Sequence, residues 1–179
     1  MTAIPELATD RLLLRGHRVE DLDAIWALHR DPDVMRFITG EPISREETWS
    51  RMLRHRGMWA MYGFGYLVVV EKSTGRIIGE CGVQERMREI DPPLLGTLEA
   101  GWMLAADVQG LGYATEAMKT VFAWCAGAHA DKQITCMINT ANERSIQLAE
   151  KLGMARQCAT SYHGDQVVIF ALPPIVAAG

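Results

Sequence analysis

The chain has 179 residues, a formal net charge of −4 and a hydrophobic fraction of 49%. This length and composition predict one folded domain over residues 1–179, with an ordered core at about 9–172. The acidic balance, without a basic block, argues against nucleic acid as the main partner. The sequence shows no stretch of membrane-spanning length and no signal peptide, so we expect no membrane association.

The four cysteines are widely separated, form no Cys-x-x-Cys pair and do not cluster with histidines: Cys81, Cys125, Cys136 and Cys158. This pattern predicts reduced thiols in a cytoplasmic protein with neither disulfides nor a metal site.

Hydrophobic periodicity predicts the elements of the N-terminal half: a strand at 9–16, helices at 19–29 and 44–55, and strands at 66–71 and 77–84. Ser44 and Glu47 form a capping box at the start of the second helix. The Met-, aromatic- and Gly-rich segment 57–65 is interpreted either as a hydrophobic loop packed under the sheet or as one wall of a substrate pocket. Residues 85–95 are predicted to form an exposed loop.

The chain is organised around residues 99–125. A strand at 99–105 alternates apolar and polar positions, a glycine-bearing turn follows at 109–114, and apolar residues from 114 to 125 recur at helical spacing. Backbone N–H groups and the positive end of the helix dipole meet at such a turn, which predicts an anion site.

The C-terminal part predicts a strand at 133–139, a helix at 142–152 and a hairpin of strands at 154–162 and 166–172. Asn142 is the expected N-cap and Gly153 the C-terminal exit of that helix. Pro173-Pro174 ends the expected core. The whole order predicts an α/β fold with a mixed sheet of about seven strands and about four helices.

The glycine turn lacks the Lys-Ser/Thr of a P-loop, and Thr115 stands where a dinucleotide fingerprint needs its third glycine. Its Gln-x-x-Gly-x-Ala pattern resembles the signature of the GCN5-related N-acetyltransferases (GNAT). The resemblance implies that the turn holds the pyrophosphate of acetyl-CoA, through Gln109, Gly110, Leu111, Gly112, Tyr113, Ala114 and Thr115.

A second motif, Asn142-Glu143-Arg144-Ser145 followed by Glu150-Lys151-Leu152-Gly153-Met154, also resembles this family. The opening residues 9–15 and the segment 31–36 are similar to its RimJ/RimL-type branch. The resemblance covers residues 9–172 and implies the GNAT-type, mostly antiparallel twisted sheet. It also implies an acetyl-CoA cosubstrate, no metal and a possible homodimer.

By this resemblance, Ser145 donates a proton to the leaving CoA thiolate, and Asn142 contacts the pantetheine arm. Backbone groups of Trp102, Met103 and Leu104 are expected to bind the cosubstrate, with an oxyanion donor near Met103, where such strands commonly bulge. Ser145 could instead bond back to its own helix. Glu99 is the candidate general base, or else an exposed strand carboxylate or a salt-bridge partner. Tyr162 and His163 are weaker candidates.

The leading hypothesis is an acetyl-CoA-dependent N-acetyltransferase that acts by direct attack of a primary amine on the thioester. The acceptor could be a protein N-terminus or a small amine, including an antibiotic. An acyl-CoA-binding module without catalysis is the alternative, and a nucleotide-binding α/β protein is a third, disfavoured hypothesis.

Overall fold

The computed structural model describes residues 3–173, so Pro174 and the ends of the expected domain lie outside the described residues. The described part contains eight strands: β1 (Leu7–Ala8), β2 (Leu12–Arg15), β3 (Tyr66–Glu71), β4 (Ile77–Gln84), β5 (Leu98–Leu104), β6 (Ile134–Asn139), β7 (Ala155–Tyr162) and β8 (Asp165–Ala171). Its five α-helices are α1 (Leu22–His29), α2 (Pro32–Met35), α3 (Arg45–Tyr62), α4 (Tyr113–Ala128) and α5 (Glu143–Lys151). Single 3-10 turns lie at Val19–Asp21 and Ala106–Val108.

The strands form one sheet in the order β1-β2-β3-β4-β5-β6-β8-β7. Every neighbouring pair is antiparallel except β5 and β6, which are parallel and are connected through α4. The predicted mixed, mostly antiparallel α/β sheet is thus confirmed, with β1 and α2 as additional short elements.

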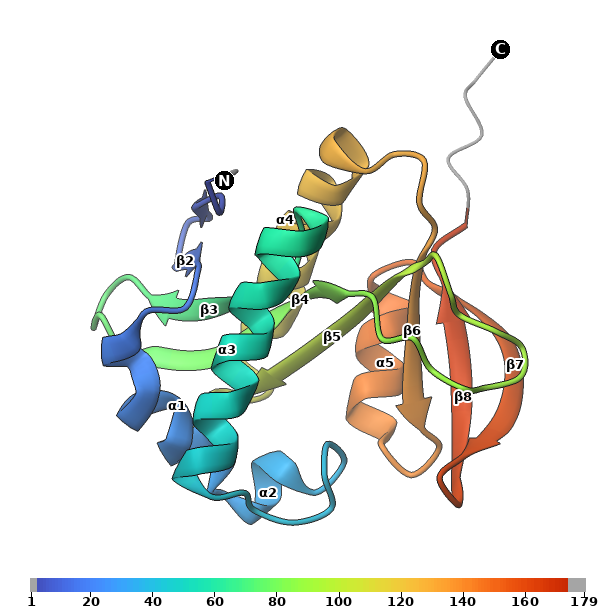
Figure 1. Cartoon of the computed structure of the whole chain (residues 1–179), viewed down its shortest axis with the longest axis horizontal. Helices are drawn as coiled ribbons and strands as arrows, with labels where there is room; N and C mark the ends of the chain where they lie inside the picture. Colours follow the sequence, from blue (N-terminus) through green and yellow to red (C-terminus); the bar gives the residue numbers. More distant parts are fainter. Residues whose placement is uncertain (1–2, 174–179) are drawn as a thin grey trace.

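Helices cover both faces of the sheet. Val68 of β3 packs with Ile25 of α1 and Met52 of α3, whereas the neighbouring Val69 belongs to the larger core that contains Met118 of α4. Adjacent strand residues point to opposite faces, so α1 and α3 cover one face and α4 the other. In Figure 1, α3 crosses the front of the sheet.

The parallel pair β5–β6 ends early. Only Leu98 and Glu99 pair with β6, opposite Ile134 and Thr135, and beyond this point the two strands diverge (Figure 1). On its other side, β5 pairs with β4 without a register shift from Glu99 to Leu104. The expected bulge near Met103 is therefore absent from this pairing, and the divergence of β5 from β6 opens the sheet instead.

Of the two interpretations of segment 57–65, the hydrophobic loop is wrong for residues 57–62. Residues 57–62 continue α3, which ends at Gly63 in the left-handed conformation (φ 74°). Trp59 is buried and its indole N–H donates to the Tyr66 carbonyl. This packing outweighs the low helix propensity of Gly57. The predicted caps hold: Ser44 and Glu47 form the capping box of α3, and the Asn142 side chain accepts from the Ser145 N–H.

Candidate functional site

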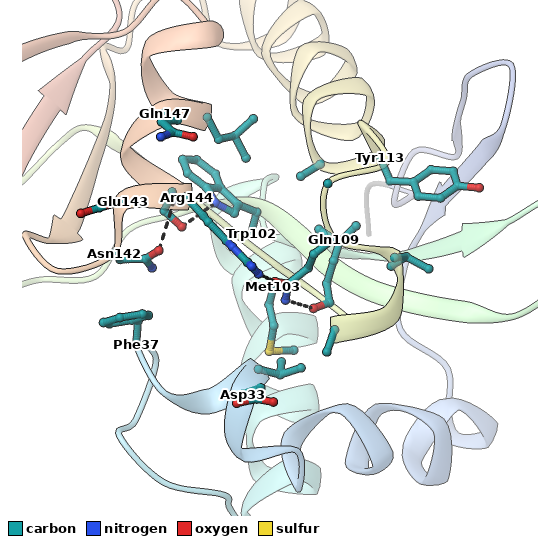
Figure 2. Close-up of a pocket in the computed structure, with 18 of the residues that line it drawn as sticks. Asp33, Phe37, Trp102, Met103, Gln109, Tyr113, Asn142, Glu143, Arg144 and Gln147 are labelled. Atoms are coloured by element: carbon teal, nitrogen blue, oxygen red, sulfur yellow. Dashed lines mark hydrogen bonds between the residues drawn. The ribbon is translucent and has the colours of Figure 1, made fainter.

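A groove of about 990 Å³ lies where β5 and β6 diverge. Its walls come from β5, the turn before α4, the start of α5 and the α2 region, and Figure 2 shows Trp102, Gln109, Asn142 and Arg144 around it. Of the residues predicted to bind the cosubstrate, all line this groove except Leu111, which is exposed.

The turn before α4 presents backbone N–H groups to the groove. Gly110 and Gly112 both have positive φ (80° and 85°), a conformation that side chains with a Cβ rarely adopt. The first bond of α4 runs from the Glu116 N–H to the Gly112 carbonyl, so the N–H groups of residues 113–115 precede the helical ladder. This arrangement suits an anion at the helix N-terminus.

The Tyr113 side chain does not point into this anion site. Its hydroxyl donates to Glu71, 2.5 Å away, and the Arg11 guanidinium lies over its ring. Figure 2 shows the ring directed away from the groove. Tyr113 can therefore contribute to the anion site only through its backbone N–H group.

Gln109 connects three parts of the groove. Its side-chain amide donates to the Leu104 carbonyl at the end of β5 (3.1 Å) and accepts from Arg144 of α5 (2.8 Å). Arg144 and Lys151 both line the groove, and the sequence interpretation gave neither a binding role. Arg144 places positive charge beside the turn before α4 and Lys151 adds a second cation to the groove wall, which favours a polyanionic ligand.

Ser145 and Trp102 meet across the groove. The Trp102 indole N–H donates to the Ser145 hydroxyl oxygen at 3.2 Å, and Asn142 positions the first turn of α5 as its N-cap. An indole only donates, so the Ser145 hydroxyl keeps its own hydrogen for another acceptor. The alternative in which Ser145 bonds back to its helix finds no such bond among residues 3–173.

The open edge of β5 carries backbone groups at alternate residues. The Leu98 N–H donates toward β6, to Gln133, whereas the Ala105 N–H donates toward β4, to Ile78. Because the direction alternates along a strand, the N–H groups of Trp102 and Leu104 face the open edge and that of Met103 faces β4. The N–H groups available at the open edge are thus those of the two neighbours of Met103, and the Met103 side chain lines the groove.

Glu99 lies outside the groove. It is 7% exposed, and its two carboxylate oxygens accept from Arg88 at 2.6 and 2.7 Å. Burial disfavours the Arg88 charge, but the hydrogen bonds and charge of Glu99 outweigh it and raise the pKa of Arg88. Arg88 also lies over the ring of Tyr162, next to the hairpin turn that holds His163. Of the interpretations given for Glu99, its contacts match the salt-bridge partner.

Glu80 of β4 lies on the same face of the sheet as Glu99 and is buried among histidines. Its oxygens contact His17 Nε2 (2.5 Å) and His29 Nε2 (2.8 Å), and the ring of His17 stacks on that of His55. One ligand atom each from His17, His55 and Glu80 lies within 4.8 Å of the others. The hydrogen bonds of Glu80 to His17 and His29 make this cluster a buried polar network between β4, α1 and the segment before α1.

The sequence profile of the acetyltransferase (GNAT) domain matches residues 11–155. The chain belongs to the GNAT acetyltransferase family. Among curated relatives, the uncharacterized protein YkkB of Bacillus subtilis (strain 168) is 30% identical over 159 residues, which are 86% of this chain and 87% of that protein. Family membership implies acyltransferase activity.

Solved structures of acetyltransferases share the fold. A GnaT-family acetyltransferase from Bordetella pertussis has a TM-score of 0.84 at 28% identity, covering 93% of this chain and 98% of that chain. An acetyltransferase from Agrobacterium tumefaciens str. C58 has a TM-score of 0.78 at 26% identity, covering 94% and 95%. RimL, a ribosomal L7/L12 alpha-N-protein acetyltransferase solved in complex with coenzyme A, has a TM-score of 0.76 at 16% identity, covering 94% and 96%.

Proposed function

We propose that this GNAT protein is an acetyl-CoA-dependent N-acetyltransferase of the RimJ/RimL-like branch, which transfers the acetyl group to a primary amine by direct attack on the thioester. The observation that supports this most is the groove itself. It combines a helix N-terminus with free N–H groups, an open strand edge and a hydroxyl with a free hydrogen. The complex of RimL with coenzyme A is consistent with this cosubstrate.

The groove residues fit acetyl-CoA in three places. The N–H groups of residues 113–115, with Arg144 and Lys151, would hold the phosphates. The open edge of β5 would hydrogen-bond the pantetheine arm, and the Trp102 and Leu104 N–H groups would stabilise the carbonyl oxygen as it gains negative charge. Ser145 would donate its proton to the departing thiolate.

The reaction needs a neutral amine, because a protonated amine has no lone pair for attack. The C–N bond forms as the C–S bond breaks, and the proton lost by the amine passes to a base or to water. Glu99 is the proposed base because it shares a strand face with Gly101 and Met103. It can act only when Arg88 leaves one of its oxygens free.

Two measurements test this proposal. Isothermal titration should show 1:1 binding of acetyl-CoA and of CoA, and NAD should bind much more weakly. A screen of primary amines should then give acceptor-dependent release of free CoA thiol. Binding without release for every amine would instead support the alternative of a catalytically silent acyl-CoA-binding module.

The remaining expectations belong to the same proposal. They are one domain over residues 1–179, a cytoplasmic location, no metal requirement, a possible homodimer, and a small-molecule or N-terminal amine as partner rather than nucleic acid or membrane. Within residues 3–173, no helix combines the length and apolarity needed to cross a bilayer.

A further inference from the structure

The face of β5 opposite Trp102 carries a second accessible surface. Gly101 pairs with Gly82, and Gly82 pairs with Tyr66, so the Tyr66 side chain projects over this face. A methyl group added to Gly101 would lie 1.7 Å from the Tyr66 hydroxyl oxygen, which shows how closely that hydroxyl approaches the strand. Both residues are only half-buried, so solvent reaches the central strand here, away from Ser145.

Arginines flank this surface from two elements. His55 of α3 stacks on Tyr66 at 4.8 Å, and Arg51 lies one helical turn before His55 on the same side of α3. Across the surface, Arg86 follows β4, and its Nε lies 4.0 Å from a carboxylate oxygen of Glu99. Glu99 shares the strand face of Gly101, two residues along.

The positive charges of this surface are not balanced. Glu99 is engaged by Arg88, and among residues 3–173 neither Arg51 nor Arg54 forms an ion pair. Burial, followed by the charges of Arg54 and Arg86, lowers the pKa of Arg51; burial and Arg86 lower the pKa of Arg54. Arg51 and Arg54 are three residues apart on α3 and are therefore neighbours on the helix surface. The charge of Arg86 opposes both of them, a cost that a bound anion would offset.

We propose that Arg51, Arg54 and Arg86, the arginine cluster, bind an anionic group of the acceptor, a carboxylate or a phosphate, while its amine lies beside the Tyr66 hydroxyl that covers Gly101. This inference rests on the proposed function and names its substrate class: a primary amine that carries a negative charge. Guanidinium groups match carboxylate and phosphate in bidentate geometry. Their positive potential also favours the neutral amine over the ammonium form, which the attack requires.

The arginine cluster should discriminate between anionic amines and cationic acceptors such as polyamines. A polycationic amine would meet three guanidiniums, of which only Arg86 has a carboxylate partner among residues 3–173, and that partner, Glu99, is already held by Arg88. Like charges at such a distance oppose binding. The surface therefore selects by the charge of the acceptor.

The first experiment measures anion binding without an acceptor. The protein is saturated with CoA, so that its phosphate site is filled, and the melting temperature is recorded against inorganic phosphate and against acetate at constant ionic strength. We expect stabilisation of the wild type that is lost in Arg51→Gln and Arg86→Gln. The preferred anion indicates whether the acceptor carries a phosphate or a carboxylate.

Arg45→Gln is the matched control, because Arg45 lies on the same helix but is exposed and pairs with Asp23. It should retain the full anion effect. Arg51→Lys keeps the charge and the fold but loses the bidentate fork, so it should weaken the effect. No anion stabilisation of the wild type, or equal stabilisation of every variant, would overturn the proposal.

The second experiment compares acceptors in matched pairs: an amino acid with its amide, and phosphoethanolamine with ethanolamine. Release of CoA thiol should be at least about tenfold more efficient with the anionic member, and Arg51→Gln should raise the KM of that member alone. A preference for the neutral members would refute the proposal. Acetyl-CoA affinity, which tests the proposed function separately, should be the same in Arg51→Gln and the wild type.

Discussion

At the scale of single residues, the direction of one hydrogen bond determines what Ser145 can do. The Trp102 indole supplies the hydrogen of that bond, so the Ser145 hydroxyl is oriented yet still able to donate. Sequence alone identified Ser145 by its motif but could not show that Trp102, 43 residues away, holds it in place.

Ser145→Ala removes the donor and leaves the groove otherwise intact. We expect turnover to fall about ten- to a hundredfold, because CoA thiol is a fair leaving group that needs only moderate assistance. The Kd for acetyl-CoA should stay close to that of the wild type. Steady-state kinetics with titration calorimetry measure both quantities, and wild-type turnover in a folded Ser145→Ala protein would leave Ser145 only a structural role.

Glu99→Gln preserves the side-chain shape and removes its basicity. If Glu99 accepts the amine proton, turnover should fall strongly at neutral pH, and the deficit should shrink as pH rises and more acceptor is already neutral. Arg88→Gln is the companion variant: it frees the carboxylate and, unlike Glu99→Gln, should retain turnover at neutral pH. Profiles of Glu99→Gln and wild type that overlay would exclude Glu99 as the base and leave it as the partner of Arg88.

At the scale of elements, the sequence predicted the features that depend on interactions between neighbouring residues. The caps of α3 and α5 and the glycine turn before α4 were readable because the deciding residues are neighbours in sequence. The end of α3 was misread because burial of Trp59 against the sheet, a long-range contact, extends the helix past Gly57. The sequence allowed a salt bridge for Glu99 but could not identify Arg88 as its partner, and it gave no sign that Arg51, Arg54 and Arg86 lie near one surface. These residues belong to α3, β5 and the segment after β4, which are far apart in the chain.

Gly112 tests the turn before α4. The protein leaves room for a Cβ there, with only an Arg11 side-chain nitrogen at 3.5 Å, so the need for glycine comes from its φ of 85°. Gly112→Ala should cost about 1–2 kcal/mol of stability from left-handed backbone strain and weaken acetyl-CoA binding more than this loss accounts for. Calorimetric Kd and thermal unfolding of the same sample separate the two effects, and unchanged affinity in a folded variant would remove this turn from the binding site.

At the scale of the whole molecule, a buried polar network connects the helices on one face to the sheet. Glu80 of β4 contacts His29 of α1 and His17, which stacks on His55 of α3. His29 also contacts Thr48 of α3 at 3.1 Å. Burial, opposed by Glu80 and reinforced by His17, lowers the pKa of His55 to about 3. Burial raises the pKa of Glu80, but its histidine partners outweigh this and hold it well below its usual value.

Because both pKa values are lowered in the folded protein, its stability decreases as the pH falls. Between about pH 6.5 and 3 the unfolded chain binds a proton at His55 and the folded protein does not, so each unit of falling pH costs up to about 1.4 kcal/mol. Glu80 adds to this loss at lower pH, because its charged form is favoured by the fold.

We expect the urea midpoint to drop steadily from pH 7 to pH 5. His55→Gln should start lower but decline less steeply, whereas His163→Asn, an exposed turn residue with positive φ that Asn tolerates, should follow the wild type. If the His55→Gln and wild-type midpoints fall in parallel, the proton uptake that drives unfolding occurs elsewhere in the chain.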